Sequence, residues 1–139
     1  MAIKYHPARG TIVAVDFRQG FRVPEMVKRR LCVVISPQIE ARAGLCTVVP
    51  LSKSDPDPVQ PYHYRLDIPF QIPKPWGNGQ RWAKCDMLCA VGFHRIDLIR
   101  LGKSPDGSRQ YQLNTLSGIH LRNISNCVLA GLGLPPLTE

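Results

Sequence analysis

The sequence predicts a mainly β protein of the β-rich α+β class: a small, strongly curved β-barrel with one C-terminal α-helix. Three observations favour this fold class. Short apolar or alternating segments, typical of strands, recur along the chain. Thirteen prolines and eleven glycines are spread along the chain, as expected for many turns. Apolar residues at helical spacing stand out in one segment only, residues 115–130.

The first two predicted strands differ in pattern. Residues 11–17 alternate, so four side chains share one face. These are Thr11, Val13, Val15 and Phe17. Residues 31–36 are apolar without alternation, which is typical of a strand buried on both faces. Between these strands lies an arginine-rich segment that we expect to be a surface loop.

Four further strands are predicted in the rest of the chain. Residues 45–51 form the expected neighbour of the buried strand, residues 62–68 an amphipathic strand, and residues 83–93 a third. The intervening segment 69–82 is too rich in Pro and Gly for regular structure, so we expect a long loop, and such loops are often functional. Pro105, Asp106 and Gly107 form a turn before a short strand at 109–113.

The terminal helix is expected at about residues 115–130, capped by Asn114 or Thr115. Gly131 and Gly133 provide its stops. Its predicted apolar side consists of Leu116, Ile119, Ile124, Cys127 and Val128. We expect one domain over residues 1–139, with poorly ordered ends at 1–8 and 134–139.

Charge and composition narrow the function classes. The 139 residues carry a net charge of +8, which favours a polyanionic partner such as nucleic acid. No apolar run approaches the roughly 18 residues needed to span a bilayer, and the N-terminus lacks the apolar core of a secretory signal. Five cysteines, an odd count, indicate reduced thiols rather than a disulfide framework. A cytoplasmic protein without membrane contact is expected.

Residue types that suit phosphate chemistry occur at three places. If residues 82–89 form a strand, Lys84 and Asp86 project from one face about 7 Å apart. The Asp86 carboxylate, as a base, and the Lys84 cation would then flank one phosphate. A surface salt bridge is the alternative for this pair. Arg30 suits a phosphate clamp because its guanidinium group matches two phosphate oxygens, and Ser52 can donate to the same group. Lys28 and Arg29 beside Arg30 also fit a solvated basic cluster.

The loop 69–82 offers an aromatic and basic surface. Trp76 and Arg81 suit stacking on nucleic-acid bases, and anchoring of the loop against the barrel is the alternative for Trp76; Trp82 is expected to anchor the loop. A zinc site at Cys85 and Cys89 with His94 is not expected, since sulfurs about 13 Å apart on a strand cannot share one ion.

The order of four short motifs resembles the PemK/MazF-like toxins of type II toxin-antitoxin systems. The motifs are Arg9-Gly10 before Val15-Asp16-Phe17, Arg30 before Cys32-Val33-Val34-Ile35-Ser36, Val49-Pro50-Leu51-Ser52, and Lys84-Cys85-Asp86. An amphipathic helix ending in Leu-Gly-Leu follows them. The resemblance runs through most of residues 9–99 and implies an SH3-like barrel, shared with the CcdB toxins.

The resemblance also implies a function. Members of the family are sequence-selective endoribonucleases that cleave single-stranded RNA without a metal or cofactor, leaving 2′,3′-cyclic phosphate and 5′-hydroxyl ends. By position, the catalytic candidates are Asp86 as general base, Lys84 and Arg30 as phosphate stabilisers, and Ser52 and Glu25 as supporting groups. Expected RNA-binding residues are Arg22, Lys28, Arg29, Lys53, Trp76 and Arg81. A homodimer and a cognate acidic antitoxin are the implied partners.

Two departures from the family pattern leave an alternative open. Pro24 precedes Glu25 where many members have His or Ser, and Lys84 stands where some have Arg. The alternative is a non-catalytic binding module of the same fold with an eroded site, acting on RNA or, like the CcdB relatives, on a protein target.

Overall fold

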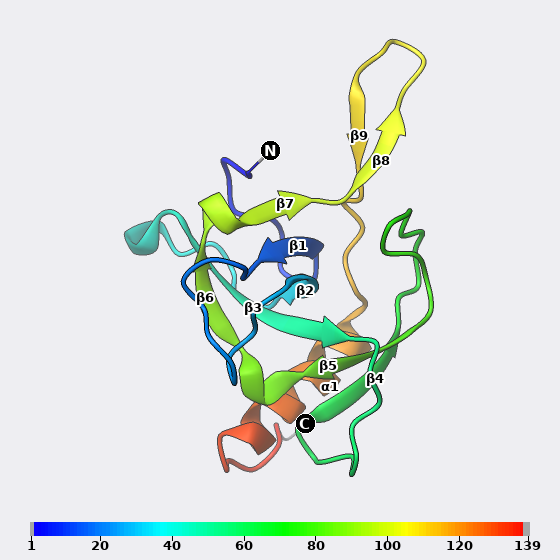
Figure 1. The fold of residues 1–139 in the computed structure, drawn as a ribbon. Helices are drawn as coiled ribbons and strands as arrows, with labels where there is room; N and C mark the ends of the chain where they lie inside the picture. Colours follow the sequence, from blue (N-terminus) through cyan, green and yellow to red (C-terminus); the bar gives the residue numbers. More distant parts are fainter. Residues whose placement is uncertain (1, 138–139) are drawn as a thin grey trace.

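A computed structural model describes residues 2–137 of the chain (Figure 1). The strands are β1 (Ile12–Asp16), β2 (Arg29–Val34), β3 (Leu45–Ser52), β4 (His63–Asp67), β5 (Gln80–Lys84), β6 (Cys89–Gly92), β7 (Ile96–Leu98), β8 (Arg100–Lys103) and β9 (Arg109–Tyr111). One α-helix, α1 (Gly118–Gly131), ends the fold. Three short 3-10 helices connect strands: η1 (Glu40–Arg42), η2 (Cys85–Met87) and η3 (Phe93–Arg95).

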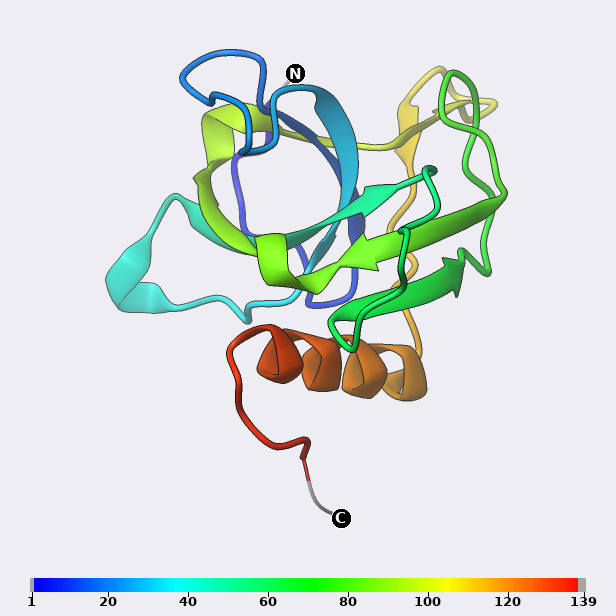
Figure 2. The same ribbon diagram turned by 60° about the horizontal axis from the view of Figure 1, so that its bottom comes forward.

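Seven strands form one antiparallel sheet. Six of them follow the order β4-β5-β3-β2-β1-β7, and the seventh, β6, pairs with β3, which also pairs with β5. The sheet curls into a ring, and α1 lies outside this ring (Figure 2). Strands β8 and β9 form a separate hairpin that projects from the body (Figure 1). The predicted fold class, mainly β with a C-terminal helix, is confirmed. The barrel is not closed, however, because no strand pairing within residues 2–137 joins β7 to β6 or to β4.

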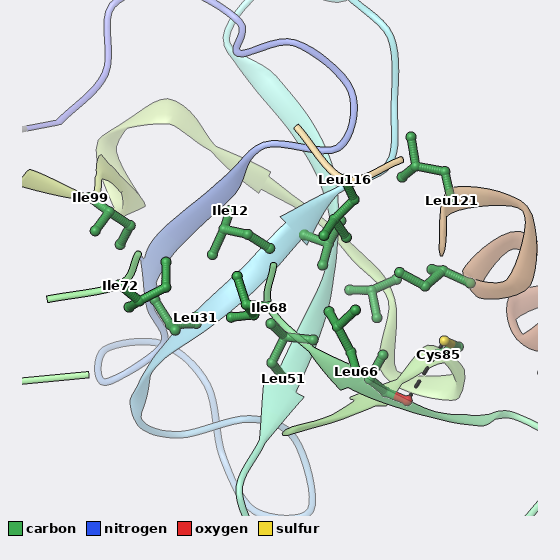
Figure 3. Close-up of a cluster of buried hydrophobic side chains, with 14 of the residues drawn as sticks. Ile12, Leu31, Leu51, Leu66, Ile68, Ile72, Cys85, Ile99, Leu116 and Leu121 are labelled. Atoms are coloured by element: carbon green, nitrogen blue, oxygen red, sulfur yellow. Dashed lines mark hydrogen bonds between the residues drawn. The ribbon is translucent and has the colours of Figure 1, made fainter. Parts of the chain in front are cut away.

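The central strands are buried on both faces. One set of side chains faces α1 and forms the helix-side core (Figure 3), which includes Ile12, Ala14, Leu31, Val33, Val49, Leu51, Leu66, Ala83 and Ile124. The opposite face forms the inner core, which includes Val13, Val15, Phe17, Cys32, Val34, Val48, Val91 and Ile96. The prediction of two-sided burial for residues 31–36 holds for residues 31–34, whereas Ile35 and Ser36 follow β2 and are only partly buried. β1 is buried on both faces as well, although its sequence alternates.

Helix α1 begins later than predicted, and its buried side differs accordingly. Ser117, not Asn114 or Thr115, is the N-cap, and its side chain accepts the backbone N–H of His120. Leu121 and Ile124 face the sheet, whereas Ile119 is 74% exposed, so its assignment to the apolar side is wrong. Residues two apart lie on nearly opposite sides of an α-helix, so Ile119 points outward when Leu121 packs inward.

The predicted strand at 83–93 is in fact two strands. β5 starts at Gln80, inside the segment expected to be a loop, and ends at Lys84. Residues 85–87 form η2, and pairing with β3 resumes only at Cys89. The break changes partners: β5 pairs with the end of β3, and β6 pairs with its beginning.

Both ends of the chain, which we expect to be poorly ordered, make contacts with the body of the fold. In the segment 1–8, the N–H of Ile3 donates to the carbonyl of Ile96 at 2.9 Å, and the Ile3 side chain is buried in the inner core. In the predicted loose end 134–139, the N–H of Leu137 donates to Asn126. Residues 1, 138 and 139 lie outside the described residues. No helix in the described part of the chain is long and apolar enough to cross a membrane.

The contrast between two isoleucines of α1 tests how the helix is held. Ile124 is fully buried in the helix-side core, so Ile124→Ala should lower the free energy of unfolding by about 2–5 kcal/mol. Ile119→Ala is the matched control in the same helix and should change it by less than about 0.5 kcal/mol. Urea unfolding followed by circular dichroism measures both. Equal losses in the two variants would contradict the placement of the helix.

Candidate functional site

A hollow of about 330 Å³ opens where the start of β2, the end of β3 and the start of β5 meet the segment 75–76. We call it the arginine hollow. It is lined by Lys28, Arg29, Arg30, Leu31, Leu51, Ser52, Lys53, Ser54, Pro75, Trp76 and Arg81. The structure therefore brings together two of the predicted catalytic residues, Arg30 and Ser52, with five of the predicted RNA-binding residues.

Strand register explains this convergence. β2 pairs with β3 so that Cys32 lies opposite Pro50, and continuing this antiparallel register by two residues sets Arg30 opposite Ser52. β3 pairs with β5 so that Ser52 lies opposite Trp82. Arg81 is therefore next to the end of β3. These residues are far apart in the sequence and meet because β2 starts, β3 ends and β5 starts at the same end of the sheet.

Arg81 is a buried cation without a carboxylate partner among its recorded contacts. The residue is only 2% exposed. Its Nη2 donates to the carbonyls of Trp76 (3.0 Å) and Gly77 (2.9 Å), while Nη1 is buried without a hydrogen-bond partner. Burial lowers the pKa of the Arg81 guanidinium below its ordinary value. Because a buried charge is costly unless paired, an anion bound here would stabilise the site.

Arg30 and Ser52 add further donors to the hollow. The Nε of Arg30 is also buried and has no hydrogen-bond partner. Ser52 is 4% exposed, and its Oγ accepts the N–H of Ser54 at 3.2 Å. The Ser52 hydroxyl can therefore donate its own hydrogen to an anion. Two guanidinium groups and one hydroxyl match the oxygens of a phosphate.

Trp76 connects the cations of the hollow. Its carbonyl accepts the Nζ of Lys53 at 3.0 Å as well as the Nη2 of Arg81. The guanidinium carbon of Arg29 lies 5.3 Å from the centre of the Trp76 ring, in a cation–π contact. The ring also packs against the helix-side core. Trp76 is thus anchored, and it still lines the hollow.

Arg22 and Glu25 lie on the exposed segment between β1 and β2 and do not line the hollow. The carboxylate of Glu25 accepts the backbone N–H of Arg22 at 2.9 Å, and the N–H of Glu25 donates back to the carbonyl of Arg22. The two residues therefore close a local turn. Three residues later, Lys28 reaches the wall of the hollow.

Lys84 and Asp86 are not part of the hollow either. The prediction that they share a strand face is wrong, because β5 ends at Lys84 and Asp86 lies in η2. Asp86 is exposed, and its backbone is next to α1: a Cβ on Gly131 would lie 3.1 Å from the Asp86 Cα. The cations of the hollow and this carboxylate are held by different parts of the fold.

The cysteines contribute to the two cores rather than to the hollow. Cys85 belongs to the helix-side core, whereas Cys89 packs against the inner core, so the two sulfurs do not converge on one ion. Burial raises the pKa of the Cys32 thiol and raises that of Cys46 to about 11. A thiolate nucleophile is disfavoured at both positions.

A second hollow, which the sequence did not indicate, adjoins the first. Its lining includes Lys74, Arg100, Arg109 and Tyr111, none of which the sequence analysis selected. The spacing of Arg109 and Tyr111 was the available signal, since residues two apart on a strand share a face. Without the partner strand and the register of the hairpin, that spacing could not be tied to a site.

Comparisons with known proteins give a consistent result. Residues 8–116 match the family model described as PemK-like, MazF-like toxin of type II toxin-antitoxin systems. An uncharacterized protein of Haemophilus influenzae is 32% identical over 109 residues, which is 69% of this chain and 73% of that protein. MazF from Deinococcus radiodurans has a similar fold, with a TM-score of 0.62 at 17% identity, covering 94% of this chain and 100% of that one. A mycobacterial endoribonuclease, solved in complex with its cognate antitoxin, has a TM-score of 0.56 at 16% identity, covering 94% and 98% of the two chains.

Anion binding in the arginine hollow can be tested by thermal unfolding. Inorganic phosphate should raise the Tm more than sodium chloride does at equal ionic strength, because binding to the folded state adds RT ln(1 + [L]/Kd) to stability. Arg81→Met should remove this increment, and Arg30→Met provides a second variant in case the first does not fold. Arg65→Met, at an exposed position on β4, is the matched control and should retain the increment. An undiminished phosphate effect in both hollow variants would exclude the site.

Proposed function

Because the chain belongs to the PemK-like, MazF-like toxin family of type II toxin-antitoxin systems, we propose that it is a sequence-selective endoribonuclease toxin. It cleaves single-stranded RNA without a metal and leaves 2′,3′-cyclic phosphate and 5′-hydroxyl ends. The observation that carries the proposal is the arginine hollow, where Arg30 and Arg81 each present a buried guanidinium nitrogen without a partner. The name of the mycobacterial structure, an endoribonuclease, supports the same activity class.

The reaction assigns distinct roles to the residues of the hollow. The 2′-hydroxyl of the RNA gives its proton to a base, and its oxygen attacks the adjacent phosphorus. A P–O bond forms, the bond to the 5′-oxygen breaks, and the leaving 5′-oxygen takes a proton from water. The guanidinium groups of Arg30 and Arg81 bind the non-bridging oxygens, whose negative charge increases in the transition state. The Ser52 hydroxyl donates to the same group. Lys53, held by the Trp76 carbonyl, adds positive charge at the rim.

A general base must take the proton of the 2′-hydroxyl, and the lining of the hollow contains neither a carboxylate nor an imidazole. Asp86, the base that the sequence favours, lies against α1 instead. Glu25 is exposed and precedes Lys28 and Arg30 by three and five residues on the same segment of chain. With the phosphate bound by Arg30 and Arg81, the proposed base is therefore Glu25.

The RNA strand on either side of the cleaved phosphate needs further contacts. Lys28, Arg29 and Lys53 border the hollow, and Arg22 lies on the segment that leads to it. These cations contact phosphates, while the ring of Trp76 can stack on a base. The positive charges of these side chains are thus available to a polyanion.

The proposed protein partners are a second copy of this chain and a cognate antitoxin. A structural neighbour was solved with its cognate antitoxin, which supports such a partner here. A net charge of +8 favours an acidic antitoxin segment, because opposite potentials speed association. Such a segment would compete with RNA for the same cations. In a homodimer, the RNA would cross the junction between the two subunits.

One observation favours a second candidate function, a non-catalytic RNA-binding module. The hollow supplies cations and a hydroxyl but no proton acceptor of its own. If no carboxylate reaches the bound RNA, the chain binds without cleaving. Cleavage by the pure protein separates the two functions.

The first functional prediction concerns cleavage itself. Pure protein should cut a long single-stranded RNA in the presence of EDTA and leave 5′-hydroxyl ends, which end mapping detects. Arg30→Ala should weaken both RNA binding and the cleavage rate, because the same guanidinium group holds the ground state and the transition state. Activity that disappears with EDTA and returns with magnesium would refute the metal-independent mechanism, and binding without any cleavage would favour the second candidate.

The second functional prediction separates the two carboxylates. Glu25→Gln should lower the single-turnover cleavage rate by about 10²–10⁴, the usual contribution of a general base, and leave RNA affinity nearly unchanged. Asp86→Asn is the matched amide control and should cleave at close to the normal rate. The opposite result, an inactive Asp86→Asn and an active Glu25→Gln, would assign the base to Asp86 and place the phosphate outside the arginine hollow.

A further inference from the structure

A second hollow of about 250 Å³ lies between the segment 73–76 and the β7–β9 region. It is lined by Arg29, Pro73, Lys74, Pro75, Trp76, Asp97, Leu98, Ile99, Arg100, Arg109 and Tyr111. Figure 1 shows the β8–β9 hairpin standing beside the long segment that precedes β5. The proposed cleavage reaction does not use this hollow.

The two hollows form one path. Arg29, Pro75 and Trp76 line both of them. The cation–π contact between Arg29 and Trp76 therefore stands at the junction, with the arginine hollow on one side and the hairpin on the other. A chain molecule that leaves the first hollow past Trp76 enters the second.

The lining of the second hollow is strongly basic. It contains Arg29, Lys74, Arg100 and Arg109 and a single carboxylate, Asp97, which forms an ion pair with Arg29 at 3.2 Å. Lys74, Arg100 and Arg109 are exposed. Exposed cations on the wall of a groove suit the phosphates of a flexible nucleic acid strand.

The register of the hairpin places an aromatic ring among these cations. Arg100 pairs with Tyr111 and Lys103 with Arg109, across a bulge next to Gly102. Paired residues share a face, as do residues two apart on a strand, so this face presents Arg100, Lys103, Arg109 and Tyr111 together. Aromatic rings interleaved with basic side chains are characteristic of surfaces that bind single-stranded nucleic acid by stacking and phosphate contacts.

We propose that the groove between segment 73–76 and the β8–β9 hairpin is a second binding site for the RNA strand, which holds nucleotides beyond the cleaved phosphate. This inference rests on the proposed function, since it extends the path of the same RNA. Arg100 and Arg109 contact two successive phosphates, and Tyr111 stacks on a base. The groove sets affinity and the length of RNA that is bound, and it takes no part in the chemistry.

Binding of uncleavable oligonucleotides of two lengths tests the proposal. Mixed-sequence 2′-deoxy strands of about four and about twelve nucleotides span the range of known single-strand site sizes. The Arg100→Ser/Arg109→Ser double variant changes exposed residues only. It should bind the long strand about tenfold more weakly and the short strand as the wild type does. For the long strand, the slope of log K against log salt should fall by about 1.4, as expected for two lost phosphate contacts.

A charge-matched control distinguishes a local site from a general loss of positive charge. Arg42→Ser/Arg65→Ser removes two exposed arginines that line neither hollow named above, so it should bind both strands nearly as the wild type does. Tyr111→Leu should weaken binding of the long strand without changing the salt slope. Equal losses in the two double variants, or equal losses for the short and the long strand, would overturn the proposal.

The remaining outcomes separate this inference from the proposed function. Suppose that the wild-type protein does not cleave RNA, but that the Arg100→Ser/Arg109→Ser double variant loses affinity for the long strand only. The proposed endoribonuclease activity would then be refuted, and the proposed RNA site in the groove would stand. Normal cleavage with unchanged binding in the Arg100→Ser/Arg109→Ser variant would refute the groove alone. If the Arg100→Ser/Arg109→Ser variant no longer binds an acidic antitoxin peptide but binds RNA with full affinity, the groove is a site for the protein partner. That result would also overturn the proposal.

Discussion

Two cations of the arginine hollow, Arg81 and Lys53, are held by backbone carbonyl oxygens instead of carboxylates, and the chemistry of the site depends on this constraint. The carbonyl of Trp76 receives both Arg81 and Lys53, and the carbonyl of Gly77 receives Arg81 again. A carbonyl orients a guanidinium group without cancelling its charge, whereas a carboxylate would neutralise it. The site therefore keeps its positive potential for an incoming anion. The cost of holding Arg81 charged in a buried position is offset when that anion binds.

The curled sheet provides the rigid support on which this arrangement rests. Because β1 and β2 are buried on both faces, the inner core and the helix-side core fix the strands from opposite directions. The end of the sheet at which β2 starts, β3 ends and β5 starts is then well defined. The hollow forms there, and segment 73–76 covers it with Trp76 anchored on the helix-side core. Preorganised donors of this kind are the usual source of transition-state stabilisation.

Much of the fold could be predicted from the sequence, and less of the site. Two-sided burial of residues 31–36 follows from their apolar run, and the C-terminal helix follows from its spacing. The cap at Ser117 is local, since serine is a favoured N-cap residue, and the sequence analysis missed it. The break after Lys84 could not be predicted, because it depends on tertiary pairing that overrides local preference. That break separates Asp86 from the strand, so periodicity alone misplaced the supposed base. The convergence of Arg30, Ser52 and Arg81 required the strand register, and the basic groove required the hairpin, whose pairing the short-range pattern does not determine.

The central claim, that the reacting phosphate is bound between Arg30 and Arg81, is tested most directly by a structure with bound RNA. The RNA should carry a 2′-O-methyl group at the cleavage position, which removes the nucleophile and leaves the phosphate intact. The account predicts a phosphate whose non-bridging oxygens lie within hydrogen-bonding distance of the guanidinium groups of Arg30 and Arg81 and of the Ser52 hydroxyl. A phosphate bound at Lys84 and Asp86, with the arginine hollow empty, would contradict it.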